Sequence, residues 1–289
     1  MKTPATHIQR PTPDAPILLA TDAAAIGIRA GTVITIEGIS RTFETDTHIP
    51  FSNPTVGRDY GIGFDSDGNL CAEIVDQNPL SGKFFAGFHF APGGNAVGRD
   101  GGDSEPAINP YSIWDIGFRP SCPDPRGMTR VQCTDGKSIW VDIYFLGVNH
   151  AEHDTSRFGE TIANGDTMGL LDYQTTVKII EGHGKRLLTY DEFRAAAYGV
   201  TERSSADRNP KKTGLDAART SRFGMMQATG NLWIWGTDGD PDDPRPSLFG
   251  GSWLHGSSAG SRYASLVYWP GNSGVFIGAR GASDHLNPV

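Results

Sequence analysis

The sequence is poor in cysteine, with three in 289 residues, and none of the three forms a C-x-x-C pair. A small, odd number without that spacing argues against a zinc site and against a disulfide framework. Cys122 and Cys133 are near enough in sequence to form a bridge, whereas Cys71 stands apart from both. We favour reduced thiols over that bridge, and we expect neither a bound metal nor a cofactor.

Long apolar segments are also absent. No uninterrupted apolar run reaches the roughly 20 residues that a helix needs to cross a bilayer. The first residues, MKTPATHIQRPTPDAP, contain no apolar core of a signal peptide. The sequence therefore predicts synthesis in a cytoplasm, no export by the ordinary secretory route and no membrane insertion.

Basic residues are outnumbered: 25 Lys and Arg face 33 Asp and Glu, for a net charge of −8. Nucleic-acid binding rests on clustered Lys and Arg, so we expect no nucleic-acid partner. A hydrophobic content of 37% is sufficient for a folded core. The 37 glycines and 19 prolines favour turns and short strands over long helices, which indicates a mostly β protein of the α+β class.

The first part of the chain is predicted to be an arm followed by a β-sandwich. Residues 1–14 are polar and rich in proline, and we expect them to become ordered only against a partner. Between residues 15 and 118, short apolar-polar alternations predict strands. The clearest are two strands in 60–75, joined at Asp67-Gly68, because an Asp-Gly step is a strong hairpin signal. Several short strands with turns between them are typical of a sandwich.

Residues 119–289 are predicted to form a second domain. The apolar run at 138–148 indicates a central strand, and a helix is expected at 172–180. A second helix is predicted to begin at Thr189, because Thr189 and Glu192 form a T-x-x-E capping box. We expect this helix to extend to about Tyr198, followed by short segments rich in glycine and tryptophan.

Residues 248–286 combine residues typical of a framework with residues typical of binding loops, and these two kinds seldom occur together. The residues interleaved with the framework follow neither the alternation of a strand nor the spacing of a helix face. Their Tyr, Ser, Gly and Asn content, with a few large apolar residues, is typical of adaptable binding loops. We interpret the segment as a recognition surface on a rigid scaffold. The residues typical of a framework are Gly250, Gly251, Trp253, Gly260, Ser261, Arg262, Gly278, Ala279, Arg280, Gly281, Asp284 and His285.

Arg262 and Arg280 are the main candidates for a buried structural role. A guanidinium carries five donors in a fixed fork, so it can tie together several loop carbonyls or a carboxylate such as that of Asp284. Side chains must satisfy the backbone groups where few ladder bonds exist. We therefore expect both arginines, with Trp253 and Asp284, to form the framework. Replacing either arginine by alanine should then lower the melting temperature.

The same segment resembles a known family. The motifs GG-x-W, AGSR, NS, IGARG and DHL follow one another through residues 250–286. In this order they resemble the variable region of the phage major tropism determinants. Those are receptor-binding proteins of the C-type-lectin fold whose C-terminal codons are rewritten by a diversity-generating retroelement. Further similarities, such as GFHFAPG at 87–93 and QATGNLWIWG at 227–236, extend the resemblance over nearly the whole chain after about residue 30.

The resemblance implies a C-type-lectin domain after the sandwich, with a variable region at residues 250–281. It implies a receptor-binding protein at the tip of a phage tail fibre, carried in the virion and without catalysis. The implied partners are a host cell-surface receptor (protein or glycan), other tail-fibre proteins and two further copies of the chain in a homotrimer. Carried over residue by residue, the variable positions fall on Ser252, Leu254, His255, Gly256, Ser258, Ser265, Val267, Tyr268, Asn272, Gly274, Phe276 and Ile277. We add Tyr263, since a large aromatic beside Arg262 suits a contact better than a tight turn, and Trp269 as a further candidate.

Two alternative functions remain open at this point. The segment HGKRLLTYDEF at 183–193 resembles formylglycine-generating enzymes, which share the lectin-like fold. Those oxidases depend on cysteines in the C-terminal half of the domain, whereas all three cysteines here precede residue 134. The other alternative is a cellular ligand-binding protein that is diversified in the same way. The calcium-binding triplets of C-type lectins, EPN or QPD with WND, are missing, which argues against calcium-dependent sugar binding.

Three minor motifs have simpler explanations. Residues 256–260 match the G-x-S-x-G nucleophile elbow, but that motif requires a preceding strand and a following helix, and neither is indicated. Histidines 150, 183 and 285 are not at metal-ligand spacing and are predicted to be hydrogen-bonded structural residues. Carboxylates in TDGDPDDP could hold calcium through oxygen ligands, although an acidic, proline-rich surface loop needs no ion. The calcium candidates are Asp238, Asp240 and Asp242.

Overall fold

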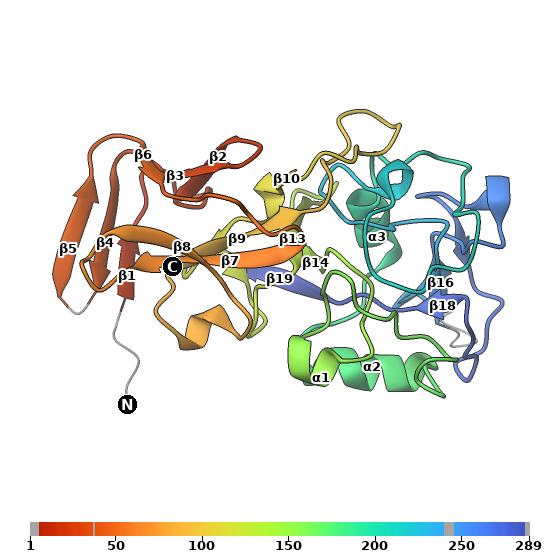
Figure 1. Cartoon of the computed structure of the whole chain (residues 1–289). Coiled ribbons are helices and arrows are strands. Elements are labelled where there is room, and N and C mark those ends of the chain that lie inside the picture. The colour runs from red at the N-terminus through yellow and green to blue at the C-terminus, as the bar shows by residue number, and fades with distance from the viewer. Residues whose placement is uncertain (1–5, 37, 240–245, 287–289) are drawn as a thin grey trace.

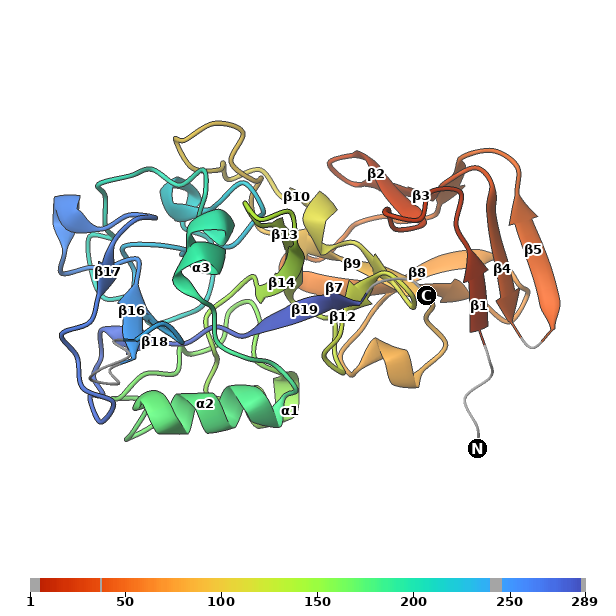
Figure 2. The same ribbon diagram turned by 180° about the vertical axis from the view of Figure 1, so that it is seen from behind.

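The computed structural model describes residues 6–36, 38–239 and 246–286. The molecule is elongated, and its two main hydrophobic cores lie along the long axis (Figure 1). The first core draws on residues 8–113 and the second on residues 131–282. Seen from behind, the same two halves are bridged by β19 (Ala282–Leu286), which extends from the second toward the first (Figure 2).

Two three-stranded antiparallel sheets form the N-terminal end. The order is β1-β4-β5 in the first and β2-β3-β6 in the second. Gly38 lies between β4 and β5, with a φ of +84° that glycine adopts without strain. The strands are β1 (Thr6–Gln9), β2 (Leu18–Asp22), β3 (Ala25–Ile28), β4 (Thr32–Ile36), β5 (Ile39–Phe43) and β6 (Thr47–Ile49).

The expected N-terminal arm is partly a strand. Residues 1–5 lie outside the described residues, but Thr6–Gln9 form β1, which pairs antiparallel with β4. Ile8 is buried in the first core, and the Arg10 guanidinium pairs with the buried carboxylate of Asp115. The expectation that residues 6–10 order only against another chain is therefore wrong, because their partners lie within the same molecule.

A third sheet completes the first core. Its order is β10-β9-β7-β8, and β11 also pairs with β9. The predicted hairpin in 60–75 is confirmed, since β7 and β8 pair antiparallel about the turn at Asp65–Asn69. Tyr60 and Phe88 stack across β7 and β9, with their ring centroids 5.5 Å apart. The strands are β7 (Arg58–Phe64), β8 (Leu70–Ile74), β9 (Ala86–Ala91), β10 (Ala107–Ile108) and β11 (Trp114–Asp115).

The fourth sheet brings the end of the chain back into the centre of the second half. Its order is β12-β19-β14-β13, so the C-terminal strand β19 lies between two strands from the middle of the chain. The strands are β12 (Arg119–Pro120), β13 (Met128–Gln132) and β14 (Ser138–Asp142). The strand predicted over 138–148 ends at Asp142. Beyond it Ile143 donates to Gly127 and Leu146 to Ala279, so this buried segment bonds to two different loops rather than to one ladder.

The helices are short and lie against the second core. They are α1 (His150–His153), α2 (Tyr173–Gly182) and α3 (Tyr190–Ala196), with 3-10 turns at Pro79–Ser81, Pro110–Ser112, Ala217–Arg219 and Gly256–Ser258. The predicted capping box is confirmed: Thr189 and Glu192 bond reciprocally to each other's backbone N–H. The second predicted helix ends at Ala196, two residues before Tyr198, and α1 was not predicted.

The fifth sheet supports the C-terminal loops. Its order is β17-β16-β15-β18, and β18 pairs parallel with β15. The strands are β15 (Trp233–Gly236), β16 (Ser247–Phe249), β17 (Ala264–Ser265) and β18 (Ile277–Gly278). Trp233 and Trp235 are buried between this sheet and α2, as expected for core tryptophans.

A buried polar network joins the two halves. Asp59 of β7 accepts hydrogen bonds from the Gly127 N–H and from Arg157 Nη1, each at 2.9 Å. His89 of β9 lies between Asp59 (3.1 Å) and the Tyr144 hydroxyl (2.9 Å). Burial alone would raise the pKa of Asp59, but the neighbouring His89 and Arg157 outweigh it and lower that pKa to about 2. The carboxylate is therefore ionised and satisfied where the halves meet.

Candidate binding surface

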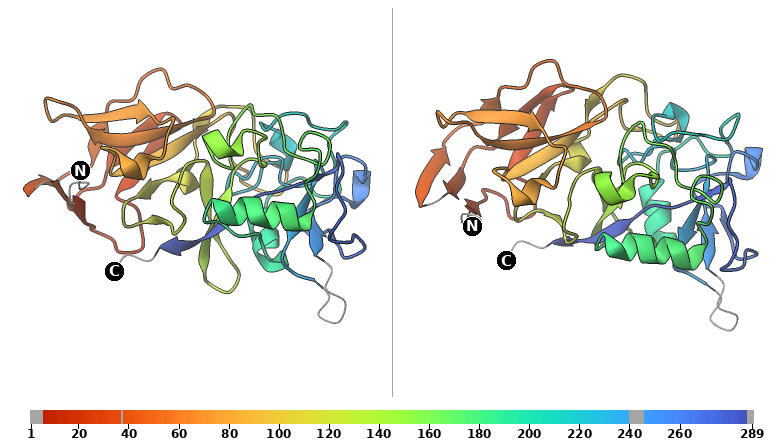
Figure 3. Two further views of the ribbon diagram at one scale, coloured as in Figure 1. Left: turned by 90° about the horizontal axis from the view of Figure 1, so that it is seen from below. Right: turned by 60° about the horizontal axis from the view of Figure 1, so that its bottom comes forward.

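The loops of residues 250–276 lie at the end of the molecule opposite the N-terminal sheets. All views place the 3-10 turn Gly256–Ser258 at this far end, and α2 runs along one side of the same half (Figure 3). Residues from different parts of the chain fix these loops in place.

Two consecutive glycines start the loops. Gly250 and Gly251 have φ values of +86° and +76°, in the left-handed region that favours glycine. The Gly250 N–H donates to the Tyr263 carbonyl at 2.8 Å, while its own carbonyl accepts from Gly230 and Gly260. A Cβ on Gly251 would lie 3.0 Å from atoms of both Ala259 and Tyr263. The backbone therefore turns sharply here and binds both ends of the loop.

Arg280 anchors the other end. Its side chain is fully buried and donates to the carbonyls of Asp142, Ile143, Met226 and Gln227. The guanidinium also lies over the Phe145 ring, 4.1 Å from its centroid. Burial lowers the pKa of Arg280 to about 9. These contacts support the framework role expected for Arg280, with loop carbonyls rather than a carboxylate as its partners.

Arg262 does not share that role. Its side chain is exposed, and its backbone carbonyl accepts from the Tyr190 hydroxyl at 2.7 Å. The expectation that Arg262 is buried is wrong, because the loop turns outward at this point. Asp284 is also exposed and pairs with Arg186 at 2.8 Å, whereas Trp253 packs against the second core and donates its backbone N–H to Asn231.

Several expected variable residues face solvent. Val267 is the most exposed large hydrophobic side chain of the segment, at 71%. A single exposed apolar side chain is ordinary, whereas a group of them on one surface marks an interaction site. The exposed members of the expected set are Leu254, Gly256, Ser258, Val267 and Asn272. The half-buried members are His255, Tyr263, Ser265, Tyr268, Gly274 and Phe276.

The half-buried aromatics form a cluster over Trp233. The ring centroid of Trp233 lies 4.8 Å from that of His255 and 4.9 Å from that of Tyr263. Tyr268 lies 6.5 Å from Trp233 and 6.0 Å from Phe276. These side chains pack on one side and remain accessible on the other, so they form rigid contact area.

Two expected variable residues are buried instead. Ile277 belongs to β18 and packs into the core beside Trp233, its parallel strand partner. Ser252 is also buried, and both its hydroxyl (2.9 Å) and its N–H (3.1 Å) bond to His255 Nδ1. The expectation of solvent-facing side chains is wrong for both, because strand pairing buries the first and a turn closed by His255 buries the second.

Leu266 was missed by the sequence analysis, and Trp269 was only a further candidate. Both side chains are exposed, at 44% and 57%. Their signal in the sequence was the run LVYW, in which four consecutive large residues cannot all face a core in an irregular segment. The exposed apolar surface is therefore larger than predicted.

The metal candidates acquire no support from the structure. Asp238 accepts a hydrogen bond from the Tyr190 N–H, and Asp240 and Asp242 lie outside the described residues. Over residues 6–36, 38–239 and 246–286, no three His, Cys, Asp or Glu side chains are grouped to hold a metal ion. No helix in that part of the chain is long and apolar enough to cross a bilayer.

The three histidines are hydrogen-bonded, as predicted. His150 Nδ1 lies 3.2 Å from His183 Nε2, although 33 residues separate them. His285 Nδ1 accepts from the Trp140 indole N–H at 2.9 Å. Burial lowers the pKa of His285 to about 4, so this imidazole is neutral at ordinary pH and can accept that bond.

Comparisons with known proteins agree with the expected resemblance. A family model described as the Mtd second domain matches residues 16–115. The tail fiber receptor-binding protein of Bordetella phage BPP-1 is 36% identical over 313 residues, which cover 92% of this chain and 81% of that protein. The solved Major Tropism Determinant I1 variant superposes with a TM-score of 0.87 at 35% identity, covering 98% of this chain and 86% of that one. The M1 variant gives 0.87 at 34% identity, with 97% and 86% covered.

These matches confirm the fold class as well as the resemblance. The chain is mostly β with three short helices among its described residues, and its C-terminal half has the C-type-lectin fold of those structures. Identity of 36% over most of both proteins is sufficient to establish kinship. This chain belongs to the phage major tropism determinant family.

Proposed function

We propose that this chain is a receptor-binding protein of a phage tail fibre, carried in the virion, and that the loops of residues 252–276 contact the host receptor. The observation that carries this proposal is the concentration of exposed apolar side chains on a fixed backbone. Leu254, Leu266, Val267 and Trp269 are four of the ten large hydrophobic side chains most exposed among the described residues. A partner that covered them would gain roughly 25 cal/mol per Å² of apolar area removed from water.

Recognition without catalysis fits the same surface. Ser258, the serine of the G-x-S-x-G match, lies in a 3-10 turn rather than between a strand and a helix. An oxidase of the formylglycine-generating type would need reactive thiols. Burial raises the pKa of Cys133 to about 11 and also raises that of Cys122, so both remain protonated and weakly nucleophilic. All three cysteines are free.

Diversification belongs to this proposal as well. Exposed loop positions tolerate substitution within about ±0.5 kcal/mol, so a retroelement could rewrite Leu254, Ser258, Val267 and Asn272 without unfolding the domain. The DNA downstream should then contain a near-identical template repeat and a reverse transcriptase gene. Tail genes alongside would support the phage setting, and their absence would favour the cellular alternative.

We also propose a homotrimer. One patch of this size would bind only moderately, and several copies on one particle raise avidity by roughly 10²–10⁴ without new contacts. Light scattering at micromolar concentration should give three times the mass of the chain. A stable monomer at that concentration would remove this part of the proposal and leave the binding surface intact.

The function is tested by adsorption of the purified protein to bacteria that the phage infects. Val267→Asp should reduce adsorption at least tenfold, because a charge would be buried against the receptor. Ile39→Asp is the matched control: Ile39 is equally exposed, at 71%, but lies in β5 at the opposite end. Equal adsorption by the two variants would contradict the assignment of this surface.

A further inference from the structure

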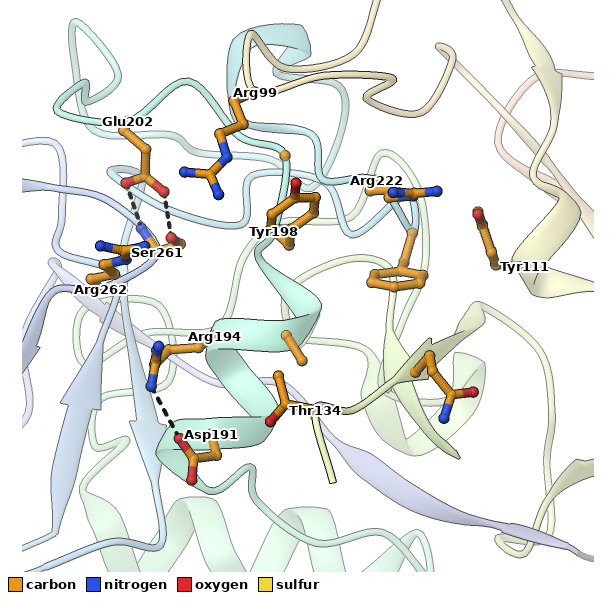
Figure 4. Close-up of a pocket in the computed structure, with 14 residues that line it drawn as sticks. Arg99, Tyr111, Thr134, Asp191, Arg194, Tyr198, Glu202, Arg222, Ser261 and Arg262 are labelled. Carbon is orange, nitrogen blue, oxygen red and sulfur yellow. Dashed lines mark hydrogen bonds and ion pairs between the residues drawn. The ribbon is translucent and has the colours of Figure 1, made fainter. Parts of the chain in front are cut away.

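A concave site lies beside the candidate binding surface. It is a cavity of about 570 Å³ between α3, the residues that follow it and the loop of Ser261 and Arg262 (Figure 4). Its volume is in the range of small-molecule sites. Four arginines line it, namely Arg99, Arg194, Arg222 and Arg262.

The four arginines carry more positive charge than the two acidic residues of the cavity wall neutralise. Arg194 pairs with Asp191 at 3.3 Å. Both oxygens of Glu202, the other acidic group of the wall, accept from Ser261, one from its N–H at 3.0 Å and one from its hydroxyl. The remaining cations are therefore not matched by the carboxylates that line the cavity among the described residues.

Two guanidinium groups of the cavity wall are available to bind a ligand. Within the described residues, Arg222 and Arg262 have no ion-pair or side-chain hydrogen-bond partner, and both side chains are exposed. Arg99 stacks on the Tyr198 ring, 5.2 Å from its centroid, which leaves its donors available. A guanidinium fork matches the geometry of a carboxylate or phosphate and binds it through two parallel hydrogen bonds.

Aromatic faces form the rest of the wall. Tyr198 is 40% exposed at the cavity, and Tyr111 packs edge-to-face on Phe223 with centroids 5.0 Å apart. Thr134 is exposed on the side of the cavity that Asp191 and Arg194 form (Figure 4). Such a wall suits a ligand that has an anion at one point, an apolar ring face at another and hydroxyl groups between them.

We propose that this cavity binds an acidic sugar residue of a bacterial surface glycan. The anion lies against Arg99 and Arg262, which are on the same side of Tyr198 (Figure 4), and the sugar ring packs on Tyr198. A polyanion such as nucleic acid is disfavoured by the net charge of −8. The inference rests on the proposed function, because it adds a glycan subsite to the receptor-binding surface.

The position of the cavity gives the subsite a distinct role. Only Ser261 and Arg262 of its wall lie within residues 250–281, and neither is among the expected variable positions. Substitutions at Leu254 or Val267 would change the neighbouring surface and leave the cavity unchanged. The acidic sugar is thus a fixed part of recognition, while the loops determine the variable part.

The test is calorimetric titration of the purified protein at low ionic strength, which preserves charge interactions. The probes are methyl glucuronide and methyl N-acetylneuraminate for the carboxylate, glucose 1-phosphate for the phosphate, methyl glucoside as neutral control and inorganic phosphate. We expect at least one acidic sugar to bind ten times more tightly than methyl glucoside, and the carboxylate and phosphate probes to identify the anion. Arg99→Gln and Arg262→Gln should each weaken that binding at least tenfold, since each removes a charge-assisted contact.

Arg208→Gln is the matched control, because Arg208 is an exposed arginine at a different cavity. The inference is overturned if no acidic sugar exceeds methyl glucoside, if both pocket variants bind as the wild type does, or if inorganic phosphate binds as tightly as the sugars. Adsorption of the same wild-type protein to sensitive bacteria is measured in parallel. Adsorption without sugar binding removes only this subsite, whereas failure to adsorb removes the proposed function.

Discussion

The sheet that contains β7 and β9 and the loops of residues 250–281 are both packed on a buried core, but different interactions hold them in place. β7 and β9 share five consecutive residue pairs in one antiparallel register. In residues 250–281 the strands β17 and β18 have only two residues each. Turns at Gly250 and Gly251 and the guanidinium of Arg280 replace the ladder there. The consequence is that a few residues hold the loops in place, and the exposed side chains between them are free to change.

The largest expected effect is at Arg280. Arg280→Ala removes the donors of four buried carbonyls and leaves a cavity, so we expect the free energy of unfolding to fall by about 3 kcal/mol or more. Urea denaturation measures this change. Arg262→Ala is the control, with an expected change within about 0.5 kcal/mol because the side chain is exposed. Similar losses of unfolding free energy in both variants would show that Arg280 is not the residue that anchors the loops.

The pH dependence of stability tests the joint between the halves. Asp59 has a folded-state pKa of about 2, below its ordinary value of 3.8, so its ionised form stabilises the fold above about pH 4. This contribution, about 2 kcal/mol, is lost as the pH falls from 4 to 2. Urea titrations of the wild type and Asp59→Asn at pH 5 and pH 2 should therefore give a difference that shrinks by that amount. A difference independent of pH would exclude this role for Asp59.

Gly251→Ala should have a smaller effect. The left-handed φ of +76° and the close approach of Ala259 and Tyr263 are both unfavourable for a Cβ, at a combined cost of about 1–2 kcal/mol. Gly271→Ala provides the comparison, since a Cβ at that position would meet no atom within 4 Å and its φ is not left-handed. Thermal unfolding of the two variants should therefore separate by several degrees. Identical melting temperatures would argue against strain at Gly251.

Local signals predicted local structure well. The Thr189–Glu192 capping box and the hairpin in 60–75 both depend on neighbouring residues, and both are present. Non-local partners were harder to foresee. Local sequence does not reveal β1, because its partner strand lies more than 20 residues away. The run at 138–148 predicts one strand that is too long, because an apolar sequence does not distinguish a strand from a buried loop.

The candidate site, too, was predicted only in part, because non-local contacts bring its residues together. Composition indicated a binding segment, but it did not tell which arginine points inward: Arg280 is buried and Arg262 is not. Ser252 and Ile277 were placed at the surface by resemblance, whereas pairing with neighbouring segments buries them. The cavity lined by Arg99, Arg194, Arg222 and Arg262 has no sequence signature, because the fold brings these residues together over a span of more than 150 positions.

Combined replacement of outward residues tests the separation between anchors and contacts most directly. A variant with Leu254→Ser and Val267→Ser changes two exposed side chains and no anchor. Its melting temperature and its adsorption to sensitive bacteria are measured on one preparation. We predict a melting temperature within a few degrees of the wild type, since each exposed substitution shifts stability by about 0.5 kcal/mol or less, together with a loss of adsorption of at least tenfold. Unfolding of the variant, or unchanged adsorption by a folded one, would contradict the account.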